Sequence, residues 1–322
     1  MTARPRIALV GSGAMGSLHA RVIAASERAE FAQLIEQRED VGKEVAGKYG
    51  VRWAGDVDGL STVDAVVIAS ATESHYDLAK HAMALGKPVL VEKPVAPKYE
   101  QSAELVADSE RLGLPLMCGF LERFNPAILT AKQLVGDVVQ VNAVRHSPFV
   151  PRIRNGVATD LLIHDVDLAI RLIGGPPSVV KGAFGYFHDV SKESRSEDSA
   201  DATMTFPDGA IATISASRIS QRKVRTISVL EVDRLIEVDL LRRDITVYKN
   251  VTHSVDGGGY RQQTIMDIPM IPYAAEPLAA QLDHFLDLIE TGAGSDAVAE
   301  ERAAILPAHV VIDKVTASAS EA

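Results

Sequence analysis

The chain has 322 residues, of which 47% are hydrophobic and 24% are charged, and its formal net charge at pH 7 is −10. This composition is typical of a globular protein, and the length predicts two domains of roughly 150 residues each. Affinity for nucleic acid comes largely from clustered Lys and Arg, so an acidic chain with 5% aromatic residues is not expected to bind it.

Cysteine content and apolar runs bear on the compartment in which the chain works. Cys118 is the single cysteine, so an intrachain disulfide is excluded and a reducing, cytoplasmic location is expected. No apolar run approaches the roughly 18 residues that a membrane-spanning helix needs, so no membrane partner is expected.

The first third of the chain alternates short apolar runs with amphipathic stretches. This pattern predicts strands at 6–10, 31–35, 64–69, 88–91 and 115–119, and helices at 14–26, 40–49, 74–85 and 99–112. Strands that alternate with helices over short connections indicate a parallel sheet covered on both faces.

After about residue 122 the pattern changes. It predicts a strand at 138–144, one long helix at 158–173, strands at 200–206, 210–216, 224–230, 234–239 and 245–248, loop tips at 191–198 and 257–259, and helices at 276–290 and 299–316. Neighbouring strands joined by turns indicate an antiparallel sheet. We therefore expect domains at 1–122 and 123–322, with the option that the terminal helices pack back on the first domain.

A glycine motif lies between the first predicted strand and helix. Residues 11–16 read GSGAMG, in which Gly11 permits a tight turn, Gly13 lets the backbone approach a pyrophosphate, and Gly16 lets helix and strand pack closely. The pyrophosphate would lie on the amide groups that open the helix, at Ala14 and Met15. The alternative is a glycine turn that only packs.

An acidic residue occurs at the spacing that a dinucleotide site requires. Glu36 follows Gly16 by 20 residues, at the end of the second strand, where a carboxylate holds the adenosine ribose hydroxyls. The carboxylate favours NAD because it would repel the 2′-phosphate of NADP. Arg38 keeps NADP open as a cofactor, since its guanidinium could pair with that phosphate.

Two further segments carry residues suited to proton transfer. Glu92, Lys93 and Pro94 end a parallel strand at its carboxyl edge, where ligands bind in open α/β sheets; the alternative for Lys93 is a solvated surface lysine. In the predicted helix at 158–173, Asp160, His164 and Asp167 share one face.

A histidine flanked by carboxylates can be tuned for proton transfer near neutral pH. The alternatives for this helix face are an ordinary salt-bridged surface and a divalent metal site. No second His or Cys cluster supports a metal, and none is expected.

A basic segment precedes that helix. Residues 145–154 read RHSPFVPRIR and contain three arginines and no acid. Arginine suits bidentate binding of phosphate or carboxylate, so Arg152 and Arg154 are candidates for an anionic substrate group. The alternative is a solvated loop.

Taken together, residues 11–16, residues 92–94 and the pattern Asp160-xxx-His164-Asp165 resemble the Gfo/Idh/MocA oxidoreductase family over essentially the whole chain. Thr72 and His75 resemble that family's nicotinamide-side element. Residues 119–126 and 151–160 are most similar to members that oxidise nucleotide sugars at C3, of the UDP-N-acetylglucosamine 3-dehydrogenase type.

The resemblance implies an α/β fold, with an N-terminal Rossmann parallel sheet and a C-terminal α/β domain that has an open, mainly antiparallel sheet. It implies that Lys93 and His164 handle the proton and that Asp160 contacts substrate. The expected cofactor contacts are Gly11, Gly13, Ala14, Met15, Gly16, Glu36, Arg38, Thr72, His75, Glu92 and Lys93, and the expected substrate contacts are Arg123, Asn125, Arg152, Arg154, Asp160 and Asp167.

The leading hypothesis is reversible hydride transfer between NAD and a secondary alcohol of a sugar, with a nucleotide sugar oxidised at C3 as the favoured substrate. The alternatives are a cofactor-binding regulator without turnover, and an enzyme that uses tightly bound NAD transiently on another sugar or polyol. The family's open sheet and the alternating apolar positions around residues 200–249 predict a homodimer or homotetramer.

Overall fold

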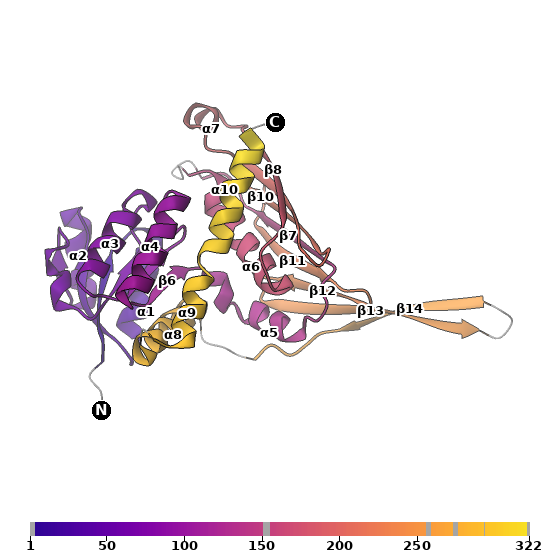
Figure 1. The fold of residues 1–322 in the computed structure, drawn as a ribbon, viewed down its shortest axis with the longest axis horizontal. Helices are drawn as coiled ribbons and strands as arrows, with labels where there is room; N and C mark the ends of the chain where they lie inside the picture. Colours follow the sequence, from indigo (N-terminus) through magenta and orange to yellow (C-terminus); the bar gives the residue numbers. More distant parts are fainter. Residues whose placement is uncertain (1–3, 151–154, 256–258, 273–275, 293, 321–322) are drawn as a thin grey trace. The chain divides into compact units, whose positions relative to one another are not determined.

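The computed structural model describes residues 4–150, 155–255, 259–272, 276–292 and 294–320 (Figure 1). The chain divides into two compact units, Met1–Leu121 with Ala275–His309 and Glu122–Ala274 with Val310–Ala322. The sequence left open whether the helices near the C-terminus belong to the first or the second domain. They belong to the first unit as far as His309.

The first unit contains the predicted parallel sheet. Its described strands form a six-stranded sheet in the order β3-β2-β1-β4-β5-β6, and all neighbours run parallel. This order is that of the doubly wound Rossmann fold, so the predicted fold of this part is confirmed. The strands are β1 (Arg6–Val10), β2 (Glu30–Ile35), β3 (Arg52–Ala54), β4 (Ala65–Ile68), β5 (Val89–Glu92) and β6 (Leu116–Gly119).

The helices of this sheet follow its strands in sequence. They are α1 (Ala14–Ala25), α2 (Glu39–Tyr49), α3 (His75–Ala84) and α4 (Tyr99–Leu112), with 3₁₀ turns η1 (Asp58–Thr62) and η2 (Thr72–Ser74). Every side chain of β4 and β5 is buried, as continuous apolar runs covered on both faces should be. The sequence reading missed β3, which is three residues long and half-exposed.

The glycine turn depends on two close backbone approaches. Gly11 has a φ of +93°, a conformation that L side chains rarely adopt, and a Cβ at this position would lie 2.7 Å from the backbone of Ser70. A Cβ on Gly16 would lie 2.2 Å from the carbonyl oxygen of Gly11. The turn after β1 and the start of α1 therefore fit together only when both positions are glycine.

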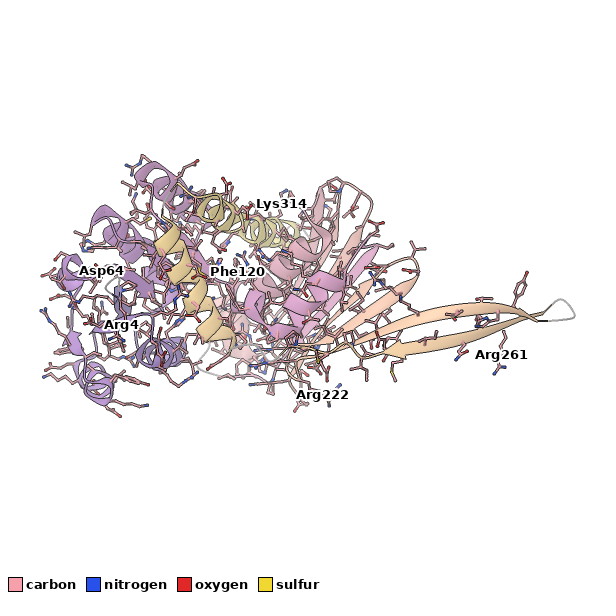
Figure 2. The ribbon with its side chains drawn as sticks, turned by 90° about the horizontal axis from the view of Figure 1, so that it is seen from below. Arg4, Asp64, Phe120, Arg222, Arg261 and Lys314 are labelled. Carbon is pink, nitrogen blue, oxygen red and sulfur yellow. The ribbon has the colours of Figure 1, made fainter. Side chains whose placement is uncertain are left out.

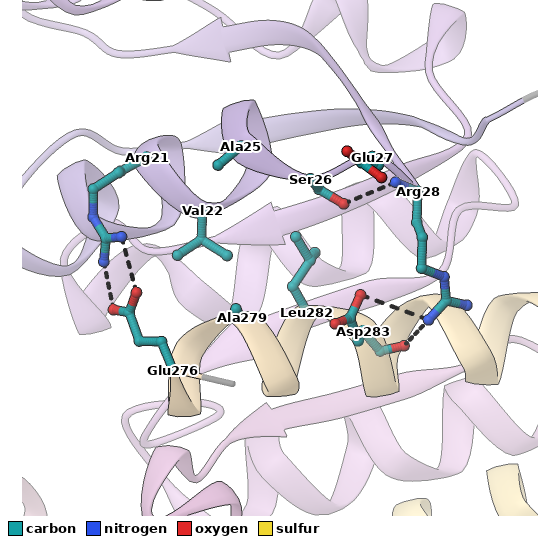
Figure 3. A pocket seen from close by; sticks show the side chains of 10 residues that line it. All are labelled: Arg21, Val22, Ala25, Ser26, Glu27, Arg28, Glu276, Ala279, Leu282 and Asp283. Carbon is teal, nitrogen blue, oxygen red and sulfur yellow. Dashed lines mark hydrogen bonds and ion pairs between the residues drawn. The ribbon is translucent and has the colours of Figure 1, made fainter. Parts of the chain in front are cut away.

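Three helices complete the C-terminal part of the chain, where the sequence predicted two. They are α8 (Pro277–Thr291), α9 (Asp296–Ala303) and α10 (Leu306–Ser320). Figure 3 shows a pocket of about 320 Å³ between α1 and α8. Arg21 lies at one end of it, paired with Glu276, and Arg28 lies at the other end, beside Asp283 at 3.6 Å. Arg28 also pairs with Asp287 at 2.7 Å. These ion pairs and the buried Leu282 fasten α8 to the Rossmann sheet's first helix.

The second unit contains a mainly antiparallel sheet, as predicted. Its described strands form an eight-stranded sheet in the order β14-β13-β12-β11-β7-β10-β9-β8, in which β7 and β10 pair in parallel and the other neighbours are antiparallel. The strands are β7 (Gln140–His146), β8 (Val179–Gly185), β9 (Ser199–Thr205), β10 (Ile211–Ser217), β11 (Val224–Leu230), β12 (Arg234–Asp239), β13 (Asp244–Val255) and β14 (Gly259–Asp267).

One face of this sheet is buried, because alternate side chains of β9 and β10 are inaccessible and those between them are exposed or half-exposed. The helices of the unit are α5 (Pro126–Leu134), α6 (Ile163–Ile173) and α7 (Asp189–Ser194), preceded by the 3₁₀ turn η3 (Leu121–Phe124) and the π-helical turn η4 (Ala158–Leu162). The end of α10 packs here as well: a Cβ on Gly182 would lie 2.6 Å from Val315.

The helical stretch predicted at 158–173 is present with those bounds, as the π-helical turn η4 followed directly by α6. Other sequence predictions for the second unit were wrong, since the loop tip expected at 191–198 begins within α7. The sequence reading missed α5, α7, β8 and β14. The other expected loop tip, 257–259, lies mostly outside the described residues. Among the helices that the structure describes, none combines the length and apolar character needed to cross a membrane.

The contact between Gly16 and Gly11 generates a first prediction. A Gly16→Ala substitution forces the helix away from the turn, so we expect a loss of about 1–3 kcal/mol in the free energy of unfolding together with weaker NAD binding. Urea unfolding and NAD titration measure the two effects. Gly47→Ala is the matched control, because Gly47 lies in α2 with no atom within 4 Å of an added Cβ. It should be neutral or slightly stabilising, and a Gly16→Ala variant as stable as Gly47→Ala would contradict the close packing.

Candidate functional site

A large pocket of the first unit lies at the carboxyl ends of the parallel strands. Its volume is about 850 Å³, within the range of small-ligand sites. Its walls come from residues 10–15 at the end of β1, residues 35–38 at the end of β2, residues 55–57 after β3, and residues 69–71, 73 and 74 after β4. The strand order reverses between β1 and β4, and this switch point is where open α/β sheets bind ligands.

The glycine turn presents the start of α1 to this pocket. Gly13 is the N-cap of α1, and no described side chain caps that position. A Cβ on Gly13 would meet no atom within 4 Å, so the turn leaves open space where a pyrophosphate could approach the backbone. Ala14 and Met15 line the same pocket with the first turn of the helix. Its amide groups and dipole fit a dinucleotide's pyrophosphate.

The carboxylate of Glu36 lies in the same pocket and is held ionised. Arg38 donates to it from Nε at 2.9 Å, and Ser12 donates from its backbone nitrogen at 3.0 Å and from Oγ at 2.7 Å. Hydrogen bonds from Arg38, and then from Ser12, lower the pKa of Glu36 to about 2 against the opposing effect of burial. The Arg38 side chain is 60% exposed and Glu36 is 9% exposed. An ionised acceptor at this point suits the ribose hydroxyls of NAD.

The segment that carries Lys93 follows β5 and is held from several sides. Lys93 is half-buried, and the Lys93–Pro94 peptide bond is cis. Glu92 is buried and lies 2.7 Å from Nε2 of His19 on α1. His75, at the start of α3, is 1% exposed and its Nδ1 lies 2.8 Å from the carbonyl oxygen of Pro94.

A third histidine fixes the next residue. Nε2 of His309, on α10, accepts a hydrogen bond from the backbone nitrogen of Val95 at 3.1 Å, while Nδ1 donates to the carbonyl oxygen of Ile305 at 2.8 Å. These two partners assign the proton of a neutral His309 to Nδ1. His19, His75 and His309 thus hold the chain immediately before and after Lys93.

In the second unit, Asp160 and His164 lie on consecutive turns. Asp160 belongs to the π-helical turn η4 and His164 to the first turn of α6, and both side chains are half-buried. π-helical turns are often found at functional sites. Glu197 accepts a hydrogen bond from the backbone nitrogen of Ala158 at 2.7 Å and so caps η4 with a carboxylate. Gly156 leaves room for this carboxylate, because a Cβ there would lie 2.0 Å from Oε2 of Glu197 and the Glu197 side chain would have to shift.

The acidic residues that follow His164 are buried in ion pairs. Arg145 on β7 binds Asp165 through Nε at 2.9 Å and Nη2 at 2.7 Å, and it binds Glu122 through Nη1 at 3.0 Å. Arg123 binds both oxygens of Asp167, at 2.9 Å and 2.6 Å. All of these side chains are at most 13% exposed.

The structure therefore gives the predicted residues of the second unit different surroundings. Asp167 does not share a polar stripe with Asp160 and His164, because the helix is not regular from 158 to 173 and Arg123 engages both Asp167 oxygens. Asn125 is 3% exposed, caps α5 and donates to the carbonyl oxygen of Leu240. Arg152 and Arg154 lie outside the described residues. Within the described part of the chain, no three His, Cys, Asp or Glu side chains gather as a metal site would require.

Two of the predicted cofactor residues do not line the pocket themselves. Thr72 belongs to η2, is half-buried and lies between the lining residues Ala71 and Glu73, and Gly16 lies in α1 just after the lining residue Met15. Sequence reasoning did not foresee the supporting contacts of His19, Glu122, Arg145, Asp165, Glu197 and His309. Their partners are far away in sequence, so local periodicity carried no signal for them.

Glu36 generates a prediction on cofactor choice. In Glu36→Gln, NAD loses an ionised acceptor and the 2′-phosphate of NADP loses a repelling charge, so we expect roughly a tenfold weaker affinity for NAD and a shift toward NADP. Titration with both cofactors measures the ratio. Glu39→Gln removes a carboxylate that is 66% exposed and serves as the control. An unchanged ratio in Glu36→Gln would contradict the assignment.

The pKa of Glu36 adds a pH dependence. Its lowered pKa stabilises the folded state fully above the ordinary value of 4.5, and this contribution is lost as the pH falls toward about 2. Between those limits the wild type should lose more stability than Glu36→Gln in urea unfolding; parallel losses would contradict the lowered pKa.

The buried pair next to His164 generates a third prediction. Asp165→Asn removes the carboxylate that accepts two of the hydrogen bonds of the buried Arg145 and leaves Glu122 to balance its charge, which should lower the free energy of unfolding by about 3 kcal/mol. Asp189→Asn is the control, because Asp189 is 93% exposed and pairs with Lys192 on the surface. It should change stability by less than about 0.5 kcal/mol. Equal losses in the two variants would argue against the buried network.

Comparison with known proteins agrees with this geometry. Residues 5–120 match the family described as "Oxidoreductase family, NAD-binding Rossmann fold", and residues 129–231 match the "GFO/IDH/MocA C-terminal domain". UDP-N-acetylglucosamine 3-dehydrogenase of Acidithiobacillus ferrooxidans is 31% identical over 288 residues, 88% of each chain. Inositol 2-dehydrogenase of Rhizobium meliloti is 27% identical over 89% of each chain.

Solved structures show the same fold over the whole chain. That of the Acidithiobacillus enzyme has a TM-score of 0.81, with 30% identity and 99% of both chains covered. A levoglucosan dehydrogenase in complex with NADH has a TM-score of 0.83 at 19% identity, over 99% of this chain and 98% of that one, and supports the fold alone. The NAD-binding Rossmann domain expected from the glycine motif and Glu36 is thereby confirmed, and the chain belongs to the Gfo/Idh/MocA family of NAD-dependent oxidoreductases.

Proposed function

We propose that this enzyme transfers a hydride between NAD and a secondary alcohol of a sugar, and that its substrate is a nucleotide sugar oxidised at C3. The observation that carries the proposal is Lys93, held at the carboxyl end of β5 beside the strands that form the dinucleotide pocket. The similarity to UDP-N-acetylglucosamine 3-dehydrogenase over 88% of the chain supports the choice of sugar.

Bound NAD supplies the hydride acceptor. The chain's own residues then have to remove the hydroxyl proton and stabilise charge on the oxygen. In our proposal either Lys93 or His164 accepts this proton. When His164 is the base, the Lys93 ammonium donates a hydrogen bond to the developing oxyanion. Asp160 accepts hydrogen bonds from neighbouring sugar hydroxyls and orients the ring.

We propose that the buried ion pairs have a structural role and hold the elements that carry the catalytic residues. Arg123 and Asp167 were expected to contact the substrate, but they form an ion pair with each other. We therefore propose that this pair fixes the position of α6 and that Asn125, the N-cap of α5, fixes α5. In the same way we propose that His75, through its contact with Pro94, and Glu92, through its contact with His19, fix the residues on either side of Lys93. Arg152 and Arg154 remain our candidates for the substrate's diphosphate, by the chemistry of arginine.

A free polyol is the second candidate substrate, because inositol 2-dehydrogenase of Rhizobium meliloti is 27% identical over 89% of the chain. A panel with UDP-N-acetylglucosamine, N-acetylglucosamine and myo-inositol separates the two candidates through NADH formation. We also propose a cytoplasmic enzyme, in line with the single, buried Cys118, and a homodimer or homotetramer.

The proposed roles of Lys93 and His164 generate a fourth prediction. Lys93→Met and His164→Asn should each lower kcat by about 10² to 10⁴, because each removes a group that handles the proton or the oxyanion. NADH absorbance with UDP-N-acetylglucosamine measures turnover, and NAD titration checks that the cofactor still binds. Lys98→Met is the control, since Lys98 is exposed in the same connection. Near-full turnover in either variant with NAD bound would refute the assignment.

A further inference from the structure

The hairpin of β13 and β14 extends beyond the sheet to which it belongs. β12 pairs with β13 from Asp244 to Lys249, whereas β14 pairs with β13 as far as Val255. From Asn250 onward the described ribbon therefore has two strands. Figure 1 shows it reaching past β12 and the rest of the second unit's sheet, and Figure 2 shows Arg261 near its far end.

β14 buries no described side chain on either face. All residues from Tyr260 to Asp267 are exposed, including Tyr260 at 81%, Met266 at 60% and Ile265 at 45%, and Ile268 just after the strand is 68% exposed. A two-stranded ribbon is marginally stable in water without packing. β14 is also the edge of the sheet, so it presents backbone N–H and C=O groups to a further strand.

The sequence of β14 is complementary to itself. If two copies of the strand pair antiparallel about Thr264, Arg261 faces Asp267 of the second copy and Tyr260 faces Ile268 of the second copy, and the two-fold axis repeats both pairs. Opposite charges and aromatic–aliphatic pairs stabilise neighbouring strands. A shift of one residue places Arg261 opposite Met266 or Ile268 and leaves the charges unmatched, so charge complementarity selects one register.

We propose that β14 pairs with β14 of a second copy of this chain, in an antiparallel register centred on Thr264, and so joins the two sheets into one. The symmetry is that of an isologous two-fold interface, in which each copy contributes the same surface. The match to the family's C-terminal domain covers residues 129–231 and ends before β12 begins. The ribbon of β13 and β14 therefore lies outside the matched residues. The proposal rests on the homo-oligomer proposed above, whose interface it specifies, and it is independent of the catalytic function and of the substrate.

A cysteine at the two-fold axis tests the register directly. In an antiparallel pair, directly opposed residues have Cα atoms about 4.5–5.5 Å apart, within the range of a disulfide. Thr264→Cys should therefore form an interchain disulfide under mild oxidation, seen as a dimer on non-reducing gels. Gln262→Cys is the matched control: two copies of position 262 would be about 13 Å apart, so it should stay uncrosslinked. Equal crosslinking of both variants, or none for Thr264→Cys, would overturn the register.

Charge reversal tests the interface without a covalent bond. R261E places two carboxylates opposite each other in each of the two pairs, and sedimentation velocity over a concentration series should show dimer dissociation raised about tenfold or more. The exchange R261E/D267R restores opposite charges and should restore the dimer, while NAD binding stays unchanged in both variants. A wild-type monomer, or a dimer insensitive to R261E, would refute β14 pairing even if the enzyme oxidises the proposed sugar.

Discussion

Arg145 and Asp165 could not be buried separately. Each side chain is at most 3% exposed, and removal of either one would leave a charge in a medium that solvates it poorly. Their two hydrogen bonds join β7 to α6 at the residue after His164, and Glu122 extends the network to the segment that opens the second unit. The position of His164 therefore depends on electrostatic matching inside the unit, in addition to apolar packing.

The segment around Lys93 is also held by buried polar contacts, and here histidine side chains make them. His19 meets Glu92, His75 meets the carbonyl oxygen of Pro94, and His309 accepts from the nitrogen of Val95, so three elements fix three successive points of one short connection. A lysine that must hold or release a proton benefits from a backbone that does not move when its charge changes. The rigid parallel sheet supplies that support, while the dinucleotide pocket opens at the same carboxyl edge.

Sequence reasoning predicted those features that depend on local pattern. The apolar runs of β4 and β5, the glycine spacing at 11–16 and the distance from Gly16 to Glu36 follow from backbone geometry, and each has the expected place in the structure. The strand β3 was missed because Arg52–Ala54 has no apolar run. The ribbon strand β14 was missed because none of its described side chains is buried in one chain.

Contacts between residues far apart in the sequence could not be predicted from local pattern. The predicted polar stripe failed because Arg123, 44 residues away from Asp167, takes up its carboxylate, and because η4 is wound as a π-helix. The helix expected at 299–316 is divided after Ala303, next to Pro307 in the first turn of α10, where proline is tolerated but does not continue a preceding helix.

We propose that Lys93 and His164 both act on the hydroxyl group of the substrate. A double-mutant cycle on kcat with Lys93→Met, His164→Asn and the double variant tests it most directly. Groups that work as one unit are strongly non-additive, so the double variant should be about as slow as the slower single variant. If the two losses instead multiply in full, the residues act independently and the proposed joint role of Lys93 and His164 is wrong.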